Sequence, residues 1–183
     1  MSQYRRDNTP GATWFFTVVT YKRQRTLCDE PVRDALREAI AQTRINWPIT
    51  IDAWVLLPDH LHCIWTLPRG DADFATRWNL IKRRTSQALK ETYFTTGLMT
   101  ASKSSRRELT FWQRRYWEHR IRDERDFERH VEYIHYNPVK HGYTVAPSSW
   151  HYSSFHRYVR NGLFPATWGS GEPIRLPEGI GHE

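Results

Sequence analysis

The sequence predicts an α+β fold, in which an antiparallel sheet has helices packed on one face and a C-terminal extension follows. The first observation is the order of the segments, because runs of β-branched and aromatic residues alternate with amphipathic runs as β-α-β-β-α-β. The second is the length of 183 residues, which suits a single domain with a sizeable core. The third is the remainder of the chain, which Pro, Gly and Ser interrupt repeatedly after a last long helical segment.

Four segments have the composition and length of strands. The first reads TWFFTVVTY, and the second and third are joined by a short Pro-Asp-His connection, so that they pair back as a hairpin. The fourth, FWQRRYWEHRI, is also rich in aromatic residues. The predicted strands are 13–21, 49–57, 61–67 and 111–121.

The helices are predicted from their start signals and from apolar residues at helical spacing. Asp29 and Pro31 mark the start of the first helix, and Pro138 is expected to end the third. The Ser/Thr-rich segment 95–110 is expected to be a mobile loop. The predicted helices are 28–44, 73–94, 122–137 and a short one around 153–161.

This order of elements is that of the ferredoxin-like or RRM-like split βαβ fold. Helices on one face of such a sheet leave the other face available for a ligand or another element. We expect a single domain at 1–168, which includes a C-terminal block at 139–168, and a flexible tail at 169–183. The sequence leaves open whether the tail lies over the active site or over a DNA groove.

Composition narrows the class of partner. The formal net charge is +7, and 14% of the residues are aromatic, including nine Trp. Both features favour unpaired nucleic acid over a membrane surface. Cys28 and Cys63 form no CxxC pair, which excludes a disulfide framework and a structural zinc site. Without a signal-peptide pattern or an apolar run of about 18 residues, a reducing cytoplasmic setting is expected.

Two histidines lie two positions apart in the third predicted strand. His60 and His62 should project from the same face, with Leu61 turned toward the core and Cys63 also facing away from them. Asp59 is expected to point to the opposite face from His60. Two neutral imidazoles on one face can bind a metal ion, and the alternative is a pair of polar side chains on a half-exposed sheet.

The third predicted helix carries the residues that would complete such a site. Tyr133 and Asn137 are four apart and share a helix face, and an amide oxygen can complete a hard-metal site. Ionising a tyrosine at pH 7 costs roughly 4 kcal/mol, which a nearby divalent ion can help to offset. The alternative is an ordinary amphipathic helix in which Tyr133 packs and Asn137 caps the end. Tyr136 is a rival nucleophile, but four residues after it stands Lys140, which cannot bind a cation.

Two motifs resemble those of a known family. LPDHLHCIW resembles the HUH motif, histidine–hydrophobe–histidine, of single-tyrosine transposases. The segment FWQRRYWEHRIRDERDFERHVEYIHYNPVKHG, followed by WHYSSFHRYVRNGLFPATWG, resembles the REP-associated tyrosine transposases. The resemblance extends from Trp14 to Gly169, and the paired motifs in this order are specific, whereas a lone HxH would not be.

The resemblance implies a mechanism and a set of site residues. His60 and His62 would bind Mg²⁺ or Mn²⁺, Asn137 would stand where related insertion-sequence enzymes use Gln as third ligand, and Tyr133 would be the nucleophile. The implied substrate is single-stranded DNA with an imperfect hairpin and a short guide sequence, of the repetitive extragenic palindrome (REP) type. Attack by Tyr133 would leave a 3′-hydroxyl and a 5′-phosphotyrosine, which another 3′-hydroxyl could resolve. A cytoplasmic, nucleoid-associated protein follows, with a monomer favoured over a homodimer.

Other candidates have weaker support from the sequence. His119 is either a third imidazole at the site or a plain strand residue, whereas His135 and His141 are expected at the surface, His141 near phosphate. A non-catalytic hairpin-binding protein and a metal-dependent hydrolase that uses water are the competing functions. Basic side chains expected to contact the DNA backbone are Lys82, Arg83, Arg84, Arg106, Arg107, Arg114 and Arg115.

Overall fold

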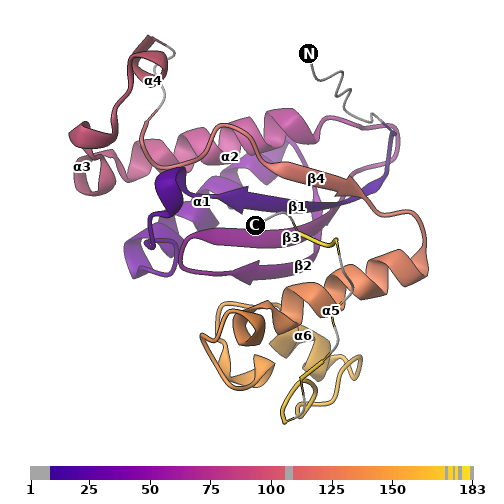
Figure 1. The fold of residues 1–183 in the computed structure, drawn as a ribbon. Coiled ribbons are helices and arrows are strands. Elements are labelled where there is room, and N and C mark those ends of the chain that lie inside the picture. Colours follow the sequence, from indigo (N-terminus) through magenta and orange to yellow (C-terminus); the bar gives the residue numbers. More distant parts are fainter. Residues whose placement is uncertain (1–8, 106–108, 172, 175, 177–178, 182–183) are drawn as a thin grey trace.

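A four-stranded antiparallel sheet forms the centre of the fold (Figure 1). The computed structural model describes residues 9–105, 109–171, 173–174, 176 and 179–181. Within this part of the chain the strand order is β2-β3-β1-β4, which is the order of the ferredoxin-like fold and confirms the predicted fold class. The strands are β1 (Thr13–Val19), β2 (Thr50–Leu56), β3 (His60–Thr66) and β4 (Trp117–Arg120).

The register of the sheet decides which side chains share a face. Thr17 on β1 lies opposite His62 on β3, and Phe15 lies between Ile64 on β3 and His119 on β4. Because alternate residues of a strand point to opposite faces, these side chains project together. The central strands β1 and β3 are almost entirely buried, so both faces of the sheet are covered.

Each face has its own hydrophobic core. Helices α1 (Glu30–Asn46) and α2 (Phe74–Ala88) pack on one face, where Trp65 and Trp78 stack with ring centroids 4.1 Å apart. On the other face lie α5 (Glu124–Lys140) and α6 (Phe155–Arg160). The face left available by the first two helices is therefore occupied by another element of the chain (Figure 1).

The predicted C-terminal block also extends the edge of the sheet. The N–H of Leu56 in β2 donates to the main-chain oxygen of Tyr152 at 2.8 Å, and Ser153 forms a β-bridge with Val55.

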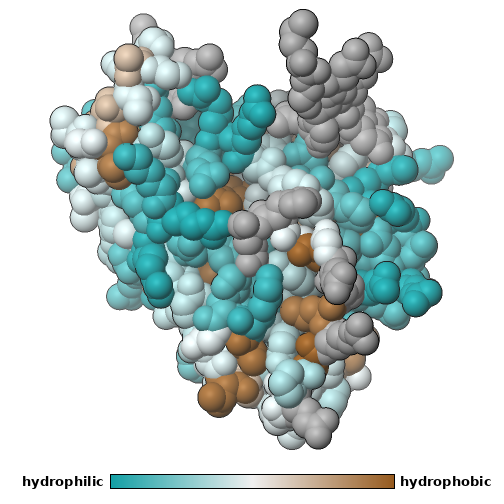
Figure 2. Space-filling model, in the orientation of Figure 1, coloured by the Kyte–Doolittle hydropathy of each residue, from teal (hydrophilic) through white to brown (hydrophobic). Residues whose placement is uncertain are grey.

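In Figure 2 hydrophobic residues gather on the lower part of the molecule, whereas hydrophilic residues dominate above. Val145 and Leu163 of the block are 86% and 64% exposed.

The structure corrects several predicted boundaries. The segment 95–110, predicted to be a loop, contains the short helix α4 (Ala101–Ser105). The helix predicted over 73–94 is divided at Leu89 into α2 and the four-residue helix α3 (Lys90–Tyr93). The fourth predicted strand shortens to β4, and before it only Trp112 makes a bridge, to Thr20. In the described part of the chain, none of the helices is long and apolar enough to span a membrane.

Pro138 does not end α5, contrary to the prediction. It lies in the last turn of the helix, which runs on to Lys140. A proline inside a helix removes one N–H donor, but here few residues follow it. The carbonyls of Asn137 and Pro138 accept hydrogen bonds from the N–H groups of His141 and Tyr143, at 3.0 and 2.9 Å. The end of the helix is therefore satisfied beyond the proline.

Candidate active site

The two histidines of the HxH motif lie together at the start of β3. His60 and His62 are 1% and 0% exposed, and their ring centroids are 4.9 Å apart. Leu61 and Cys63 belong to the opposite hydrophobic core, which confirms the predicted alternation. A strand beginning at His60 therefore projects both imidazoles toward the face that α5 covers.

Each imidazole is held through its Nδ1 atom. Asp59 Oδ1 lies 2.7 Å from Nδ1 of His60, and Thr17 Oγ1 lies 2.9 Å from Nδ1 of His62. A partner at one ring nitrogen fixes the tautomer and orientation of the ring, so Nε2 is the atom with which each ring would bind a metal. This is the arrangement of metal-binding histidines, in which a carboxylate or hydroxyl orients the ligand.

The prediction that Asp59 points away from His60 was wrong. Strand β3 begins at His60, so Asp59 belongs to the preceding turn and the alternation of a strand does not apply to it. Its carboxylate also accepts a hydrogen bond from Arg23 at 3.2 Å. Burial acts to raise the pKa of Asp59, but His60 and Arg23 together lower it to about 2. Asp59 is therefore an anion at neutral pH.

The tyrosine predicted as nucleophile lies against this pair. Tyr133 on α5 is 2% exposed, and its ring packs edge-on against His62 with centroids 5.2 Å apart. Asn137 follows one turn later on the same helix and is fully buried. The Tyr133 hydroxyl accepts a hydrogen bond from Lys140 Nζ at 3.2 Å. Residues about seventy positions apart in sequence thus meet on one face of the sheet.

Tyr136, the rival nucleophile, faces a different part of the molecule. Its ring lies 6.1 Å from that of Trp168, and its hydroxyl accepts a hydrogen bond from the N–H of Ile174 at 3.3 Å. Residues of the predicted tail lie against both tyrosines, because Gly181 is so close to the Tyr133 hydroxyl that any larger residue there would clash with it. The described part of the tail therefore packs at this site, and its flexibility in solution stays a prediction.

Other histidines are not where the sequence placed them. His135, expected at the surface, is fully buried among aromatic rings, including that of Tyr158 at 4.6 Å. Helix α6 covers His135, and the residue pattern of α5 alone gives no sign of this packing. His141 is half-buried, and its ring centroid lies 5.2 Å from that of His60. It is therefore a further imidazole beside the histidine pair.

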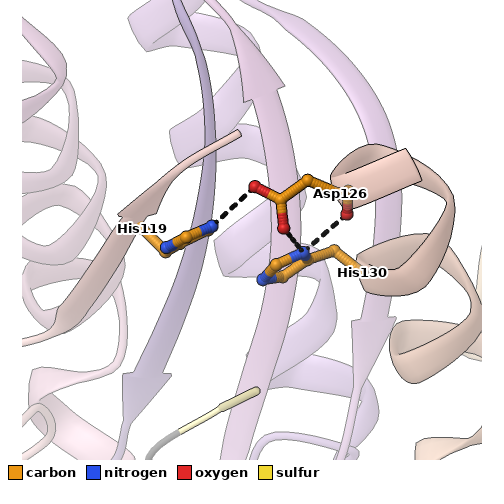
Figure 3. A group of neighbouring side chains, drawn as sticks. All are labelled: His119, Asp126 and His130. Atoms are coloured by element: carbon orange, nitrogen blue, oxygen red, sulfur yellow. Dashed lines mark hydrogen bonds and ion pairs between the residues drawn. The ribbon is translucent and has the colours of Figure 1, made fainter. Parts of the chain in front are cut away.

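His119 belongs to a separate group of side chains with Asp126 and His130 (Figure 3). The carboxylate of Asp126 points between the two rings, with His119 Nε2 at 2.9 Å and His130 Nδ1 at 3.2 Å. Donor atoms of all three lie within 4.8 Å of one another, as a metal site requires. The two rings are nearly parallel, at 13°, with centroids 4.7 Å apart. Sequence analysis missed Asp126 and His130.

Hydrogen bonds and burial set the charges in this group. Burial works against the charged form of Asp126, but the hydrogen bond with His119 and the Arg122 N–H hold its pKa below the usual range. Burial lowers the pKa of His130. Because a carbonyl oxygen can only accept, His130 Nδ1 donates to the main-chain oxygen of Asp126 at 2.7 Å. Among the described residues, the buried Nε2 of His130 has no hydrogen-bond partner.

The basic residues predicted to contact DNA fall into three groups. Lys82 and Arg84 bind within the fold, because Lys82 Nζ donates to the main-chain oxygen of Gln113 at 2.5 Å and Arg84 to Thr43 Oγ1 at 2.7 Å. Arg83, Arg114 and Arg115 are exposed, as DNA contact requires. Arg106 and Arg107 lie outside the described residues.

Comparison with known proteins gives the family. Residues 13–137 match the family described as "Transposase IS200 like", a span that includes His60, His62, Tyr133 and Asn137. The chain therefore belongs to the IS200-like transposase family, the single-tyrosine or Y1 transposases.

Individual relatives identify the group within this family. The chain is 44% identical to a REP-associated tyrosine transposase of Escherichia coli strain K12, over 92% of this chain and 91% of that protein. It is 39% identical to a protein of Haemophilus influenzae strain Rd described as a "Putative REP-associated tyrosine transposase", over 96% and 98% of the two chains. A solved structure of a REP-associated tyrosine transposase bound to a REP hairpin is 40% identical and superposes over the whole of both chains with a TM-score of 0.78. Within the IS200-like family, the chain therefore groups with the REP-associated tyrosine transposases.

Proposed function

We propose that this chain is a metal-dependent single-stranded DNA endonuclease and strand transferase, with Tyr133 as the nucleophile. The observation that carries the proposal is the packing of Tyr133 on His62, at 5.2 Å between ring centroids, with Asn137 one helical turn away. A phenol placed beside two oriented imidazoles and an amide is the arrangement that metal-assisted phosphodiester transfer needs.

The residues that would hold the metal are His60, His62 and Asn137. The family resemblance implies Mg²⁺ or Mn²⁺, and the amide oxygen of Asn137 is a ligand that such hard ions accept. The two imidazoles, whose rings Asp59 and Thr17 already fix, would bind through Nε2. When bound, a divalent ion supplies neutralisation of the negative charge on the phosphate under attack. The triad of His119, Asp126 and His130 is the second candidate group for metal binding in the described residues.

The reaction exchanges one phosphodiester bond for another. Tyr133 Oη forms a bond to phosphorus while the bond from phosphorus to the 3′-oxygen breaks. The phenol proton passes to solvent and the departing 3′-oxygen takes up a proton, so that the charge balances. The 5′-phosphotyrosine conserves the energy of the broken bond, and attack by another 3′-hydroxyl can rejoin the strand without an external energy source.

We propose a REP-type hairpin as the substrate. The relative in the solved complex is bound to a REP hairpin and is 40% identical to this chain, and the net charge of +7 favours a polyanion. Arg83, Arg114 and Arg115 are the stronger candidates for backbone contacts because they are exposed. Arg106 and Arg107 remain candidates in this proposal, and Lys82 and Arg84 are weaker ones because they are bonded within the fold.

The site also bears on the oligomeric state. Insertion-sequence relatives are expected to take the tyrosine and the HUH motif from different chains. Here Tyr133 contacts His62 within one chain, which supports a monomer. The alternative function is a non-catalytic hairpin-binding protein descended from such an enzyme. It would not require Asp59 and Thr17 to orient the histidines beside Tyr133.

A denaturing gel tests the proposed chemistry. The protein is mixed with labelled single-stranded hairpin DNA from repeats flanking its gene, with Mg²⁺ or Mn²⁺, beside Tyr133→Phe, Tyr136→Phe and His62→Ala variants. We expect a slow band that survives denaturation, requires metal, persists in Tyr136→Phe and is lost in the other two. Tight binding without adduct or cleavage would favour the non-catalytic binder, and cleavage by Tyr133→Phe would point to Tyr136 or to water.

A further inference from the structure

Lys140 lies on the same stripe of α5 as the proposed nucleophile and metal ligand. Tyr133, Asn137 and Lys140 occupy positions i, i+4 and i+7, which project from one face of a helix. Lys140 Nζ donates a hydrogen bond to the Tyr133 hydroxyl at 3.2 Å and lies 4.9 Å from the centroid of the Tyr133 ring. The ammonium group therefore lies beside the phenol oxygen.

An ordinary explanation for this lysine is its place at the end of the helix. Basic residues are common in the last turn, where they interact with the helix dipole. That interaction requires only proximity to the terminal carbonyl groups. Here the amine reaches back two turns to a hydroxyl on a side chain that is 2% exposed. The dipole alone does not account for that direction.

We infer that Lys140 is a catalytic residue of the proposed reaction, which holds the Tyr133 oxygen in place and stabilises negative charge on it as it attacks phosphorus. This role rests on the proposed function. A lysine ammonium has three donors and no acceptor, so Lys140 cannot take the phenol proton. It keeps its own protons throughout, while the phenol proton passes to solvent as described above. In the covalent intermediate it lies beside the oxygen that joins Tyr133 to phosphorus.

Three variants separate this role from a structural one. Lys140→Met keeps the length of the side chain and removes its charge, Lys140→Arg keeps the charge, and Lys90→Met removes an exposed charge on α3 as a matched control. Removing one preorganised donor from a reacting oxygen typically slows a reaction by about 100-fold or more. We expect Lys140→Met to lose about that factor in the rate of adduct formation at saturating DNA and metal. Lys140→Arg should recover most of it, and Lys90→Met should match the wild type.

Two further readouts keep the outcomes distinct. Hairpin affinity and the thermal unfolding midpoint should be unchanged in Lys140→Met, since a general loss of structure would lower both. The ¹³Cζ NMR signal of Tyr133, assigned with Tyr133→Phe and recorded at fixed pH without DNA, should move in Lys140→Met and much less in Lys140→Arg. An unmoved signal would contradict the contact itself, independently of any activity.

A substrate with sulfur in place of the bridging 3′-oxygen locates the action of Lys140. A thiolate leaves without needing a proton, so a residue that assists the leaving group becomes dispensable with this substrate. We expect the defect of Lys140→Met to persist, because Lys140 contacts the nucleophile. Disappearance of the defect, or adduct formation by Lys140→Met at the wild-type rate, would overturn the inference. Absence of any adduct with the wild type would instead contradict the proposed function.

Discussion

The carboxylate of Asp59 lies 2.7 Å from Nδ1 of His60, so Nε2 is the ring nitrogen that would face a metal ion. The same carboxylate is bound by Arg23, and these two partners lower the pKa of Asp59 to about 2 although burial opposes ionisation. A carboxylate in this position orients the imidazole and raises its basicity as a ligand. We therefore expect Asp59 to support the proposed site, although strand alternation in the sequence had assigned it to the opposite face.

Replacing Asp59 by Asn should weaken metal binding. Loss of the partner of a metal-binding histidine typically costs about 10- to 100-fold in metal affinity. We expect this loss for Asp59→Asn in a titration with Mn²⁺ followed by calorimetry. Asp34→Asn is the matched control, because Asp34 is an exposed carboxylate on α1 that pairs with Arg37. Equal affinity of Asp59→Asn and the control would show that this contact does not support the site.

Thr17 should have a similar role for His62. Its hydroxyl is buried and lies 2.9 Å from Nδ1 of His62, and valine has the same shape without the oxygen. The substitution Thr17→Val leaves the buried Nδ1 of His62 without its hydrogen-bond partner, so it should lower the free energy of unfolding by about 1–3 kcal/mol. It should also slow adduct formation, whereas Thr17→Ser should retain both properties. Urea denaturation and the gel assay measure the two effects, and identical behaviour of Val and Ser would refute the prediction.

Arg77 should be essential to the stability of the opposite face. It is fully buried, and its guanidinium bonds Asp71 at 2.6 Å and the main-chain oxygen of Pro48 at 2.9 Å. Asp71 is 29% exposed, so the pair is buried on the arginine side only, and its loss should cost less than the about 3–5 kcal/mol typical of a fully buried pair. It should still cost more than loss of an exposed pair, which contributes less than about 1 kcal/mol. Arg77→Met should therefore lower the free energy of unfolding more than Arg37→Met, whose pair with Asp34 is exposed. Similar denaturation midpoints for the two variants would contradict this.

Acid should destabilise the fold partly through His135. Burial in an aromatic environment, with nearby Arg157 and His156, lowers the pKa of His135 to about 3. Because the unfolded chain binds a proton near pH 6.5 and the folded chain does not, stability is present above that pH and falls as the pH drops. Between pH 7.5 and pH 5 the loss from this group should be about 2 kcal/mol. A His135→Gln variant should show a flatter dependence of unfolding free energy on pH, and parallel curves would exclude His135 as the cause.

Local patterns in the sequence were sufficient to predict the fold class and the faces on which the proposed site residues lie. Alternation along β3 placed His60 and His62 on one face and Leu61 on the other, because successive strand residues point in opposite directions. Helical spacing placed Tyr133 and Asn137 on one stripe of α5. Both periodicities are properties of the backbone, so they depend on nearby residues only. The order of the strands and helices then limited the fold to the split βαβ arrangement.

The errors occurred where the local period stops or where a distant segment covers a surface. Asp59 lies in a turn, where strand alternation gives no guidance, and Pro138 lies in the last helical turn, where the loss of one donor is tolerated. His135 was expected at the surface because its helix was considered alone. The C-terminal block buries it, and Ser154 Oγ lies 3.0 Å from its Nε2.

The sequence by itself determined the sheet, the pair of histidines and the helical stripe that carries the tyrosine, because these follow from repeating backbone geometry. Only the tertiary structure decided which partners complete the site. Thr17 meets His62 through the register between β1 and β3, and Lys140 reaches Tyr133 through the path of a flexible side chain. Such contacts depend on packing between segments far apart in the chain or on rotamers, and neither is encoded in a local pattern of residue types.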